Sequence, residues 1–288
     1  MRVFGTAAVA VAVLAAGARG QEAVEIKLPR HSAGARVRVA VESNQTAVQT
    51  TRVFGQESAT TVKKVFKATF VDEHVLPLDA EGAREKLVRT YEKYEASLDG
   101  KLQPAPPLGT AITIEKRDGR YSYTVNGKPL SDAVVAVLDS EFARKQGMRG
   151  DNVAPPGPVK PGTVWKLDPI EVFKGYGGEG KVPLLLDKGA MTAKLVKTEK
   201  RDGRTFGTLE FVAQLPVKES GADKGYKLKP GTVLNYSETI ESALDGAPAP
   251  GRSVAAVSSK IQLDAEQATV IYAVETRTAI ATEPLPKK

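Results

Sequence analysis

Cysteine is absent from all 288 residues of the chain, and histidine is nearly absent, since only His31 and His74 occur. Without cysteine there are no disulfides, thiolate nucleophiles or thiolate metal ligands. Two histidines leave little material for general acid–base catalysis or for a metal site. We therefore expect no catalytic residue, no metal ligand and no cofactor, and the sequence does not identify a ligand-binding residue.

The triplet Asp72-Glu73-His74 is the one place where metal-binding residue types adjoin each other. Neighbouring residues of a strand point to opposite faces, so at most two of the three could face one ion. We interpret the triplet as a solvated strand end.

Long apolar runs are missing after the first twenty residues, and that first stretch has the features of a secretory signal peptide. Arg2 supplies the positive start, residues 3–17 form an apolar run shorter than a membrane span, and Ala18 and Gly20 stand at the −3 and −1 positions of a cleavage site. We predict removal of residues 1–20 and a mature chain, 21–288, that is secreted or periplasmic and has no transmembrane segment. An uncleaved membrane anchor is the alternative.

The charge is mildly basic. The formal net charge is +7, and Arg2 and Arg19 would leave with the signal peptide, which gives 7 − 2 = +5 for the mature chain. No basic stripe with interleaved aromatic residues occurs, so we predict no nucleic-acid binding. We interpret the positive side chains as solvated strand positions rather than as a site for anionic polymers or lipid headgroups.

Apolar and polar residues alternate with a period of two along most of the chain, which is typical of half-buried strands. The apolar positions include Val37, Val39, Val41, Phe66, Phe70, Tyr121, Tyr123, Met191, Leu195, Leu209, Phe211, Leu234, Tyr236, Val257, Ile261, Val270, Val274 and Ile280. Short turns such as Asp118-Gly119 and Asp202-Gly203 require antiparallel neighbours. We predict a mainly β (α+β) fold, with one large antiparallel sheet, curved or partly closed as a half-barrel, and one packed helix.

Residues 131–146 are predicted to form that helix, with Ser131 as its cap and Leu138 and Phe142 on its apolar face. Residues 87–98 fit a helix by spacing, but we favour a strand with Val88, Thr90 and Tyr94 on one face. Residues 147–162 carry four prolines and read as a connection. Residues 21–288 then form a single β domain, or two lobes joined at 147–162.

Three further features suggest chemistry but have simpler explanations. Residues 175–181 match glycine patterns of nucleotide-binding loops, but Val182 replaces the hydroxyl residue of a P-loop and no long helix follows. Asp139 and Glu141 lie two apart on the predicted helix, where side chains diverge. Trp165, the only tryptophan, could stack on a sugar or lipid, but we interpret it as a core anchor.

Two strings recur in the chain. Residues 115–120 and 199–204 both read Glu-Lys-Arg-Asp-Gly-Arg, and residues 160–164 and 229–233 both read Lys-Pro-Gly-Thr-Val. A duplicated half with an insertion is one explanation. We favour the other, in which hairpin turns and strand starts reuse the same residues.

The strings at residues 89–93, 115–121 and 159–165 resemble uncharacterised exported bacterial proteins that have a signal peptide, many antiparallel strands and no assigned activity. This resemblance implies the fold but carries no catalytic residue across. At the level of strand pattern, the chain is also similar to half-barrel lipoprotein carriers and lipid-binding lipoproteins, although it lacks their lipidated cysteine.

The leading functional hypothesis is an exported, non-catalytic binding protein that holds an apolar ligand or lipid in a curved sheet. A structural or protein-interaction module of the cell envelope, with an envelope protein as partner, is the first alternative. A hydrolase built from carboxylates on the sheet is the second.

Overall fold

The computed structural model describes residues 22–28, 32–76, 85–142, 150–173, 184–218 and 227–287. The predicted signal peptide, His31 and the glycine loop at 175–181 lie outside these ranges. Among the described residues, no helix is long and apolar enough to cross a membrane.

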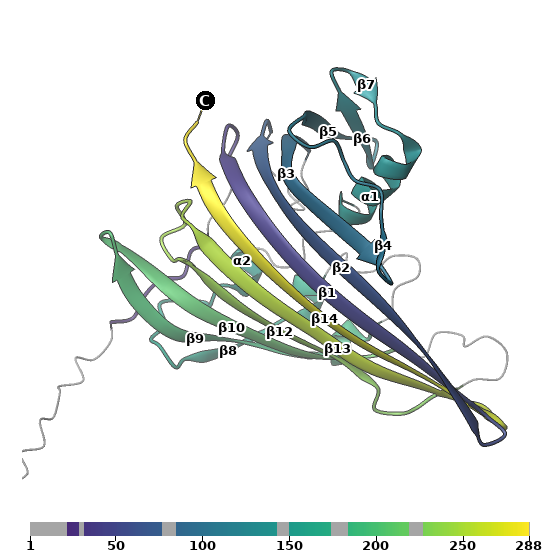
Figure 1. Cartoon of the computed structure of the whole chain (residues 1–288). Helices are drawn as coiled ribbons and strands as arrows, with labels where there is room; N and C mark the ends of the chain where they lie inside the picture. The colour runs from purple at the N-terminus through teal and green to yellow at the C-terminus, as the bar shows by residue number, and fades with distance from the viewer. Residues whose placement is uncertain are drawn as a thin grey trace, which may run out of the picture.

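Fourteen strands form one curved, antiparallel sheet (Figure 1). From one edge to the other the strands are β7 (Lys128–Pro129), β6 (Arg120–Val125), β5 (Ala111–Arg117), β3 (Lys86–Leu98), β2 (Gln56–His74), β1 (Arg36–Val53), β14 (Ala268–Leu285), β13 (Gly251–Asp264), β12 (Val233–Ala243), β10 (Arg204–Pro216), β9 (Ala190–Arg201) and β8 (Val164–Leu167). The short strands β4 (Lys101–Leu102) and β11 (Lys227–Leu228) pair with β3 and β13. The described order begins at β7 and ends at β8, so the sheet is open, and the predicted fold class is confirmed.

The two halves of the chain meet where β1 pairs with β14, from Arg36–Leu285 to Val53–Ala268. The N-terminal strands lie on one side of this pair and the remaining C-terminal strands on the other. The chain therefore passes from the β7 edge to the β8 edge through residues 130–163, a segment that contains helix α1 (Asp132–Phe142) and the short helix α2 (Gly150–Val153).

One face of the sheet, here called the capped face, carries the apolar positions predicted from the alternation. The register shows this directly along one row: Phe66 pairs with Ser43, Ser43 with Thr278, and Thr278 with Ala255. The row continues through Glu238 and Phe211. The opposite, outer face carries charged side chains in cross-strand ion pairs, which is the solvated face that the sequence predicts.

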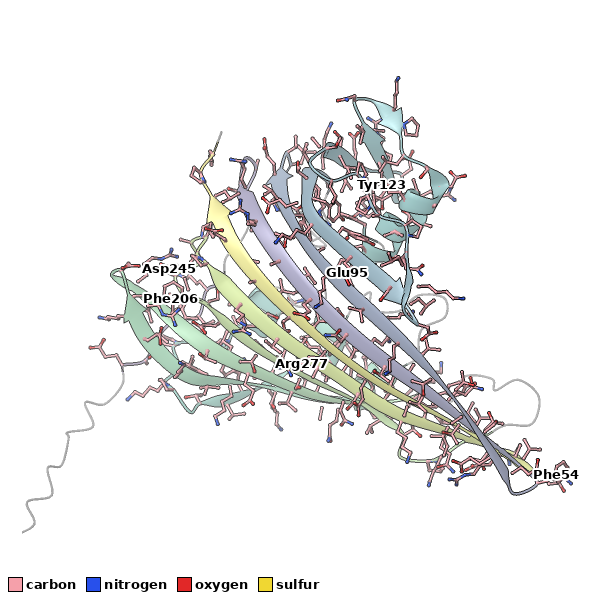
Figure 2. The ribbon with its side chains drawn as sticks, viewed as in Figure 1. Phe54, Glu95, Tyr123, Phe206, Asp245 and Arg277 are labelled. Atoms are coloured by element: carbon pink, nitrogen blue, oxygen red, sulfur yellow. The ribbon has the colours of Figure 1, made fainter. Side chains whose placement is uncertain are left out.

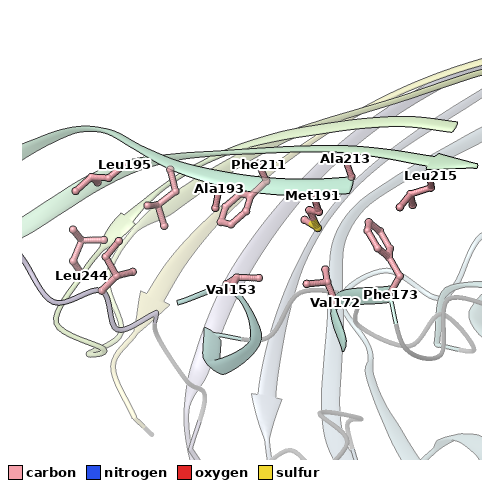
Figure 3. Close-up of a cluster of buried hydrophobic side chains, with 12 residues drawn as sticks. Val153, Val172, Phe173, Met191, Ala193, Leu195, Phe211, Ala213, Leu215 and Leu244 are labelled. Atoms are coloured by element: carbon pink, nitrogen blue, oxygen red, sulfur yellow. The ribbon is translucent and has the colours of Figure 1, made fainter. Parts of the chain in front are cut away.

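Both ends of the capped face are covered. Helix α1 packs on the α1 cluster, a set of buried side chains that consists of Ala68, Phe70, Leu87, Tyr91, Ile112, Ile114, Tyr123, Leu138 and Phe142. At the other end, α2 and the short helix α3 (Pro169–Phe173) cover the β9–β10 cluster (Figure 3). This second cluster consists of Ile26, Val153, Val172, Phe173, Met191, Ala193, Leu195, Leu209, Phe211, Ala213, Leu215 and Leu244. α2, α3 and the single 3-10 turn η1 (Leu186–Lys188) add to the one helix that the sequence predicts.

The predicted helix is α1, described from Asp132 to Phe142, and residues 143–146 of the prediction lie outside the described ranges. The carbonyl of Ser131 accepts hydrogen bonds from the amides of Val134 and Val135, which starts the helix where the sequence indicates. Leu138 and Phe142 are buried against the sheet.

Residues 87–98 form strand β3, as favoured, but the predicted face is wrong. The pairing register of β2 with β3 shifts by one residue between Thr69, which pairs with Lys93, and Phe70, which pairs with Tyr91. The unpaired residue is Glu92, so β3 has a β-bulge there. The bulge places Leu87, Arg89 and Tyr91 on the same face as Tyr94, and Val88 and Thr90 on the outer face. The extra residue also produced the helix-like spacing, because it breaks the period of two.

The repeated strings are local turn structure. Both copies of Glu-Lys-Arg-Asp-Gly-Arg form two-residue hairpins, one between β5 and β6 and the other between β9 and β10. Only the second copy holds a loop: Arg204 donates two hydrogen bonds to Asp245, at 2.7 and 2.8 Å, and others to the carbonyls of Ala247 and Pro248. Arg120, the matching residue of the first copy, is exposed.

Candidate functional site

Helices cover the two ends of the capped face more completely than its middle. Between the two clusters lies a central strip, formed by the capped-face residues of β1, β14, β13 and β12. Its members are half-buried: Ser43, Glu238, Ser253, Ala255, Val257, Val274, Thr278 and Ile280. Apolar side chains under the helices are, in contrast, almost completely buried; Leu87, Phe211 and Leu215 are 0 % exposed. The strip is therefore apolar surface that the described part of the chain covers only in part.

A cavity opens at one end of the strip. It has a volume of about 180 Å³, and Val37, Ile240, Ser253 and Ile280 contribute to its lining. Most of its lining residues belong to the capped face of β1, β12, β13 and β14. Ligand sites for small molecules are concave and mostly apolar, with a few polar groups. A cavity of this size would hold part of a ligand, and the rest would lie along the strip.

Glu238 is the only charged residue on the capped face of β1, β12, β13 and β14. It accepts hydrogen bonds from the hydroxyl groups of Tyr236, on the same strand, and Ser253, on β13. Carboxylates on an apolar face need such donors, because an unsolvated charge is costly. The two hydroxyls fix the carboxylate beside the cavity, where it could accept a hydrogen bond from the polar end of a bound molecule.

Hydroxyl groups supply the other polar atoms of the strip. The side chains of Ser43 and Thr278 bond to each other at 2.8 Å across the β1–β14 pair. Because one hydroxyl donates to the other, this hydrogen bond lowers the cost of polar atoms on a mainly apolar surface. The arrangement suits an apolar molecule with few polar groups.

A second polar group lies under α1, and sequence reasoning missed it. Arg89 is 0 % exposed and binds Asp72 through two hydrogen bonds of 2.6 and 2.8 Å. It also donates to Glu141 of α1 and, at 3.1 Å, to the hydroxyl of Tyr91. The guanidinium lies 3.6 Å from the ring centre of Phe70.

Electrostatics keep this group charged. Burial by itself lowers the pKa of Arg89, but the charges of Asp72 and Glu141 outweigh it and leave that pKa well above its ordinary value. Burial raises the pKa of Tyr91. The group therefore joins α1 to β2 and β3 as a buried ion network. The sequence could have indicated this network through Arg89, a charged residue on the capped face. The bulge in β3 breaks the period of two, so the alternation did not place Arg89 on that face.

Asp139 and Glu141, the two carboxylates of α1, each accept a hydrogen bond from a side chain of the sheet. Glu141 belongs to the Arg89 network, and Asp139 accepts a hydrogen bond of 2.8 Å from Tyr123. Burial, followed by the hydrogen bond to Asp139, raises the pKa of Tyr123. The structure brings both residues to the sheet through α1, but each has its own partner there.

The interpretation of Asp72-Glu73-His74 as a solvated strand end is wrong. Asp72 and His74 are 2 % and 3 % exposed. Buried Arg89 binds the carboxylate of Asp72, and the backbone of His74 exchanges hydrogen bonds with Gly34 and Ala35. Glu73 faces the other way and pairs with Arg36 at 3.5 Å. Among the residues that the structure describes, no three His, Asp or Glu side chains gather as metal ligands.

Trp165 lies on the capped face opposite Ala193 and packs against the β9–β10 cluster. Its indole N–H donates to the carbonyl of Val153 at 3.0 Å. This contact holds α2 over the sheet, so the residue acts as an anchor for the cap.

A larger depression, of about 610 Å³, lies mainly on the outer face. Small residues, including Ala40, Ala279 and Ala281, form much of its lining, and charged residues such as Lys67 and Arg252 surround them. Lys67 pairs with Glu42 at 3.2 Å. More apolar than polar surface lines this depression, and charged side chains border it, so it is a second concave surface of the sheet beside the central strip.

No family model and no curated protein matches this chain. A solved structure of lipid–protein interactions in lipovitellin aligns over 86 % of this chain and 25 % of its own, with 9 % identity and a TM-score of 0.35. The outer membrane protease OmpT from Escherichia coli aligns over 87 % and 97 %, with 10 % identity and a TM-score of 0.20. DynF from the dynemicin biosynthesis pathway of Micromonospora chersina aligns over 96 % and 92 %, with 11 % identity and a TM-score of 0.15. The chain thus spans a quarter of the lipovitellin chain, and similarity at these levels assigns neither ligand nor activity.

Proposed function

We propose that the protein is a non-catalytic binding protein that holds an apolar ligand, such as a lipid, on the central strip. The observation that carries the proposal is the uneven burial of the capped face. Side chains at both ends are packed against helices, whereas Ala255, Val257, Val274 and Ile280 between them stay half-buried although they are apolar. Covering such surface with an apolar ligand would stabilise the complex by about 25 cal/mol for each Å² removed from water.

The polar groups of the strip define the kind of ligand further. Glu238 and its two hydroxyl donors lie beside an otherwise apolar surface, so a ligand with one hydroxyl or amine group and an apolar body fits best. The packed clusters at both ends leave the ligand no other place on this face. We expect the apolar body to lie across β13, β14 and β1.

A matched pair of variants tests the site. Val257 lies on the strip, and its neighbour Ser258 is exposed on the outer face. Val257→Lys should abolish binding of a fluorescent fatty alcohol, because the charge replaces apolar contact surface. Ser258→Lys adds the same charge next to it and should bind as the wild type does. Circular dichroism melting of both variants establishes that each is folded.

Native mass spectrometry of gently purified protein gives a second, independent measurement. An apolar molecule bound to the wild type, and missing from Val257→Lys, supports the proposal. Protein without any bound molecule that also fails to bind the fatty alcohol contradicts it, as does equal binding by the two lysine variants.

A structural or protein-interaction role in the cell envelope stays an alternative prediction, and a salt-sensitive pull-down of one specific partner would favour it. Export also stays a prediction. N-terminal sequencing of the secreted or periplasmic protein should find Gln21 as the first residue.

A further inference from the structure

The hairpin between β1 and β2 ends in a turn whose residues differ from those of the other hairpins. In the described ranges, five two-residue turns have both backbone φ angles positive, and four begin with Asp or Asn followed by Gly: Asp99-Gly100, Asp118-Gly119, Asn126-Gly127 and Asp202-Gly203. The fifth begins with Phe54, at φ 50°, followed by Gly55. Positive φ favours Gly, Asn and Asp in such turns and is unfavourable for a bulky residue.

The local structure does not compensate for this choice. Phe54 is 77 % exposed, so most of its ring contacts solvent rather than the chain. An exposed aromatic side chain in an unfavourable backbone conformation costs stability, and residues that break local rules in this way gather at functional sites. The turn therefore suggests a role for the ring outside the folded chain.

The position of the turn fits a contact with another surface. Figure 2 shows Phe54 at the narrow tip of the sheet, far from α1 and α2. The next residue, Val53, is 39 % exposed, and the nearby charges of Arg52 and Glu57 neutralise each other at 2.6 Å. The tip therefore exposes the apolar side chains of Val53 and Phe54, and the neighbouring Arg52–Glu57 pair adds no net charge to it.

We propose that this tip docks the protein on a lipid bilayer by inserting Phe54 at the membrane–water boundary. A protein partner requires a buried patch of about 800 Å² on each side, whereas a bilayer accepts single aromatic side chains at its interface. One aromatic ring gives weak and reversible attachment. The inference rests on the proposed function, because a protein that carries a lipid must meet a membrane to load or release it.

Sedimentation with phosphatidylcholine vesicles tests the docking. Phe54→Asn removes the ring and installs the residue preferred in the turn, so we expect a higher melting temperature together with partitioning weaker on the order of tenfold. Phe54→Trp should partition at least as well as the wild type and shift its added emission to the blue. Leu102→Asn is the control, since Leu102 is 78 % exposed on β4, away from the tip, and should sediment as the wild type does.

Three results would overturn the docking: a wild type that does not sediment with vesicles, equal sedimentation of Phe54→Asn and the wild type, or a complex with a protein that depends on Phe54 without vesicle binding. Native mass spectrometry separates this proposal from the previous one. Phe54→Asn should keep the ligand of the central strip, whereas Val257→Lys should lose that ligand and still sediment.

Discussion

Replacing Arg89 with methionine tests the buried ion network under α1 quantitatively. The substitution removes the hydrogen bonds to Asp72, Tyr91 and Glu141 and the contact of the guanidinium with Phe70. It leaves the carboxylate of Asp72, which is 2 % exposed, without the guanidinium that neutralises it. Breaking a buried pair in this way costs about 3–5 kcal/mol, a large share of the roughly 5–15 kcal/mol that stabilises a domain.

The assay is urea unfolding followed by circular dichroism and by the fluorescence of Trp165, which lies at the other end of the sheet. A double variant, Arg89→Met with Asp72→Leu, removes the buried carboxylate as well and should recover about half of the loss or more, because replacing both partners by apolar groups costs little. Arg117→Met is the control: Arg117 is 73 % exposed in its pair with Glu115, so the loss should stay below about 1 kcal/mol. A cost below about 1 kcal/mol for Arg89→Met, or a double variant less stable than the single one, would refute the reasoning.

Two further predictions concern the C-terminal half. The hydrogen bond from Arg204 lowers the pKa of Asp245 from 3.8 to about 2, so the pair adds stability that is present above pH 3.8 and is lost as the pH falls towards 2. Arg204→Gln should therefore lower stability at neutral pH by less than about 1 kcal/mol, and unfolding measured between pH 7 and pH 2 should depend less on pH than in the wild type. Arg120→Gln is the control and should change neither quantity. Gly207→Ala would place a Cβ 2.7 Å from a methyl group of Leu244 and should lower the free energy of unfolding in urea by about 1–3 kcal/mol. Gly157→Ala, where the added Cβ meets open space, is the control and should leave that free energy unchanged.

The alternation of apolar residues was enough to predict the sheet and its covered face. Residues such as Val41, Phe211 and Ile280 were all assigned to the face that the register gives them. This worked because a side-chain period of two is intrinsic to a strand, and a one-residue error would expose every apolar residue. Turn residues added the antiparallel order.

The features that could not be predicted depend on a local irregularity or on long-range contacts. The bulge at Glu92 reverses the face of the first half of β3, so the alternation placed Val88 and Thr90, and not Arg89, on the face of Tyr94. The partners of Arg89 come from β2 and α1, and no sequence spacing brings Asp72 and Glu141 together. The end of β2 at His74 likewise makes its backbone hydrogen bonds with Gly34 and Ala35, which lie far from it in the sequence.

The central strip shows the same limit. Its apolar residues Val257, Val274 and Ile280 were correctly predicted to lie on the covered face, but the difference between a filled and a partly open region of one face depends on where the helices lie. Helices α2 and α3 are only 4 and 5 residues long, too short to be recognised from spacing. Glu238 interrupts the apolar pattern of β12, and only the register shows that it lies on the same face as Ile240 and Ser253.

Labelling with a diazirine-bearing fatty alcohol tests the central claim most directly. After irradiation, mass spectrometry of the peptides identifies the side chains that the bound molecule contacts. Labels on Ile280 and Val257 of the capped face, reduced by excess unlabelled fatty alcohol, are the predicted result. Labels on Ala279 and its outer-face neighbours, or none that the competitor removes, would contradict it.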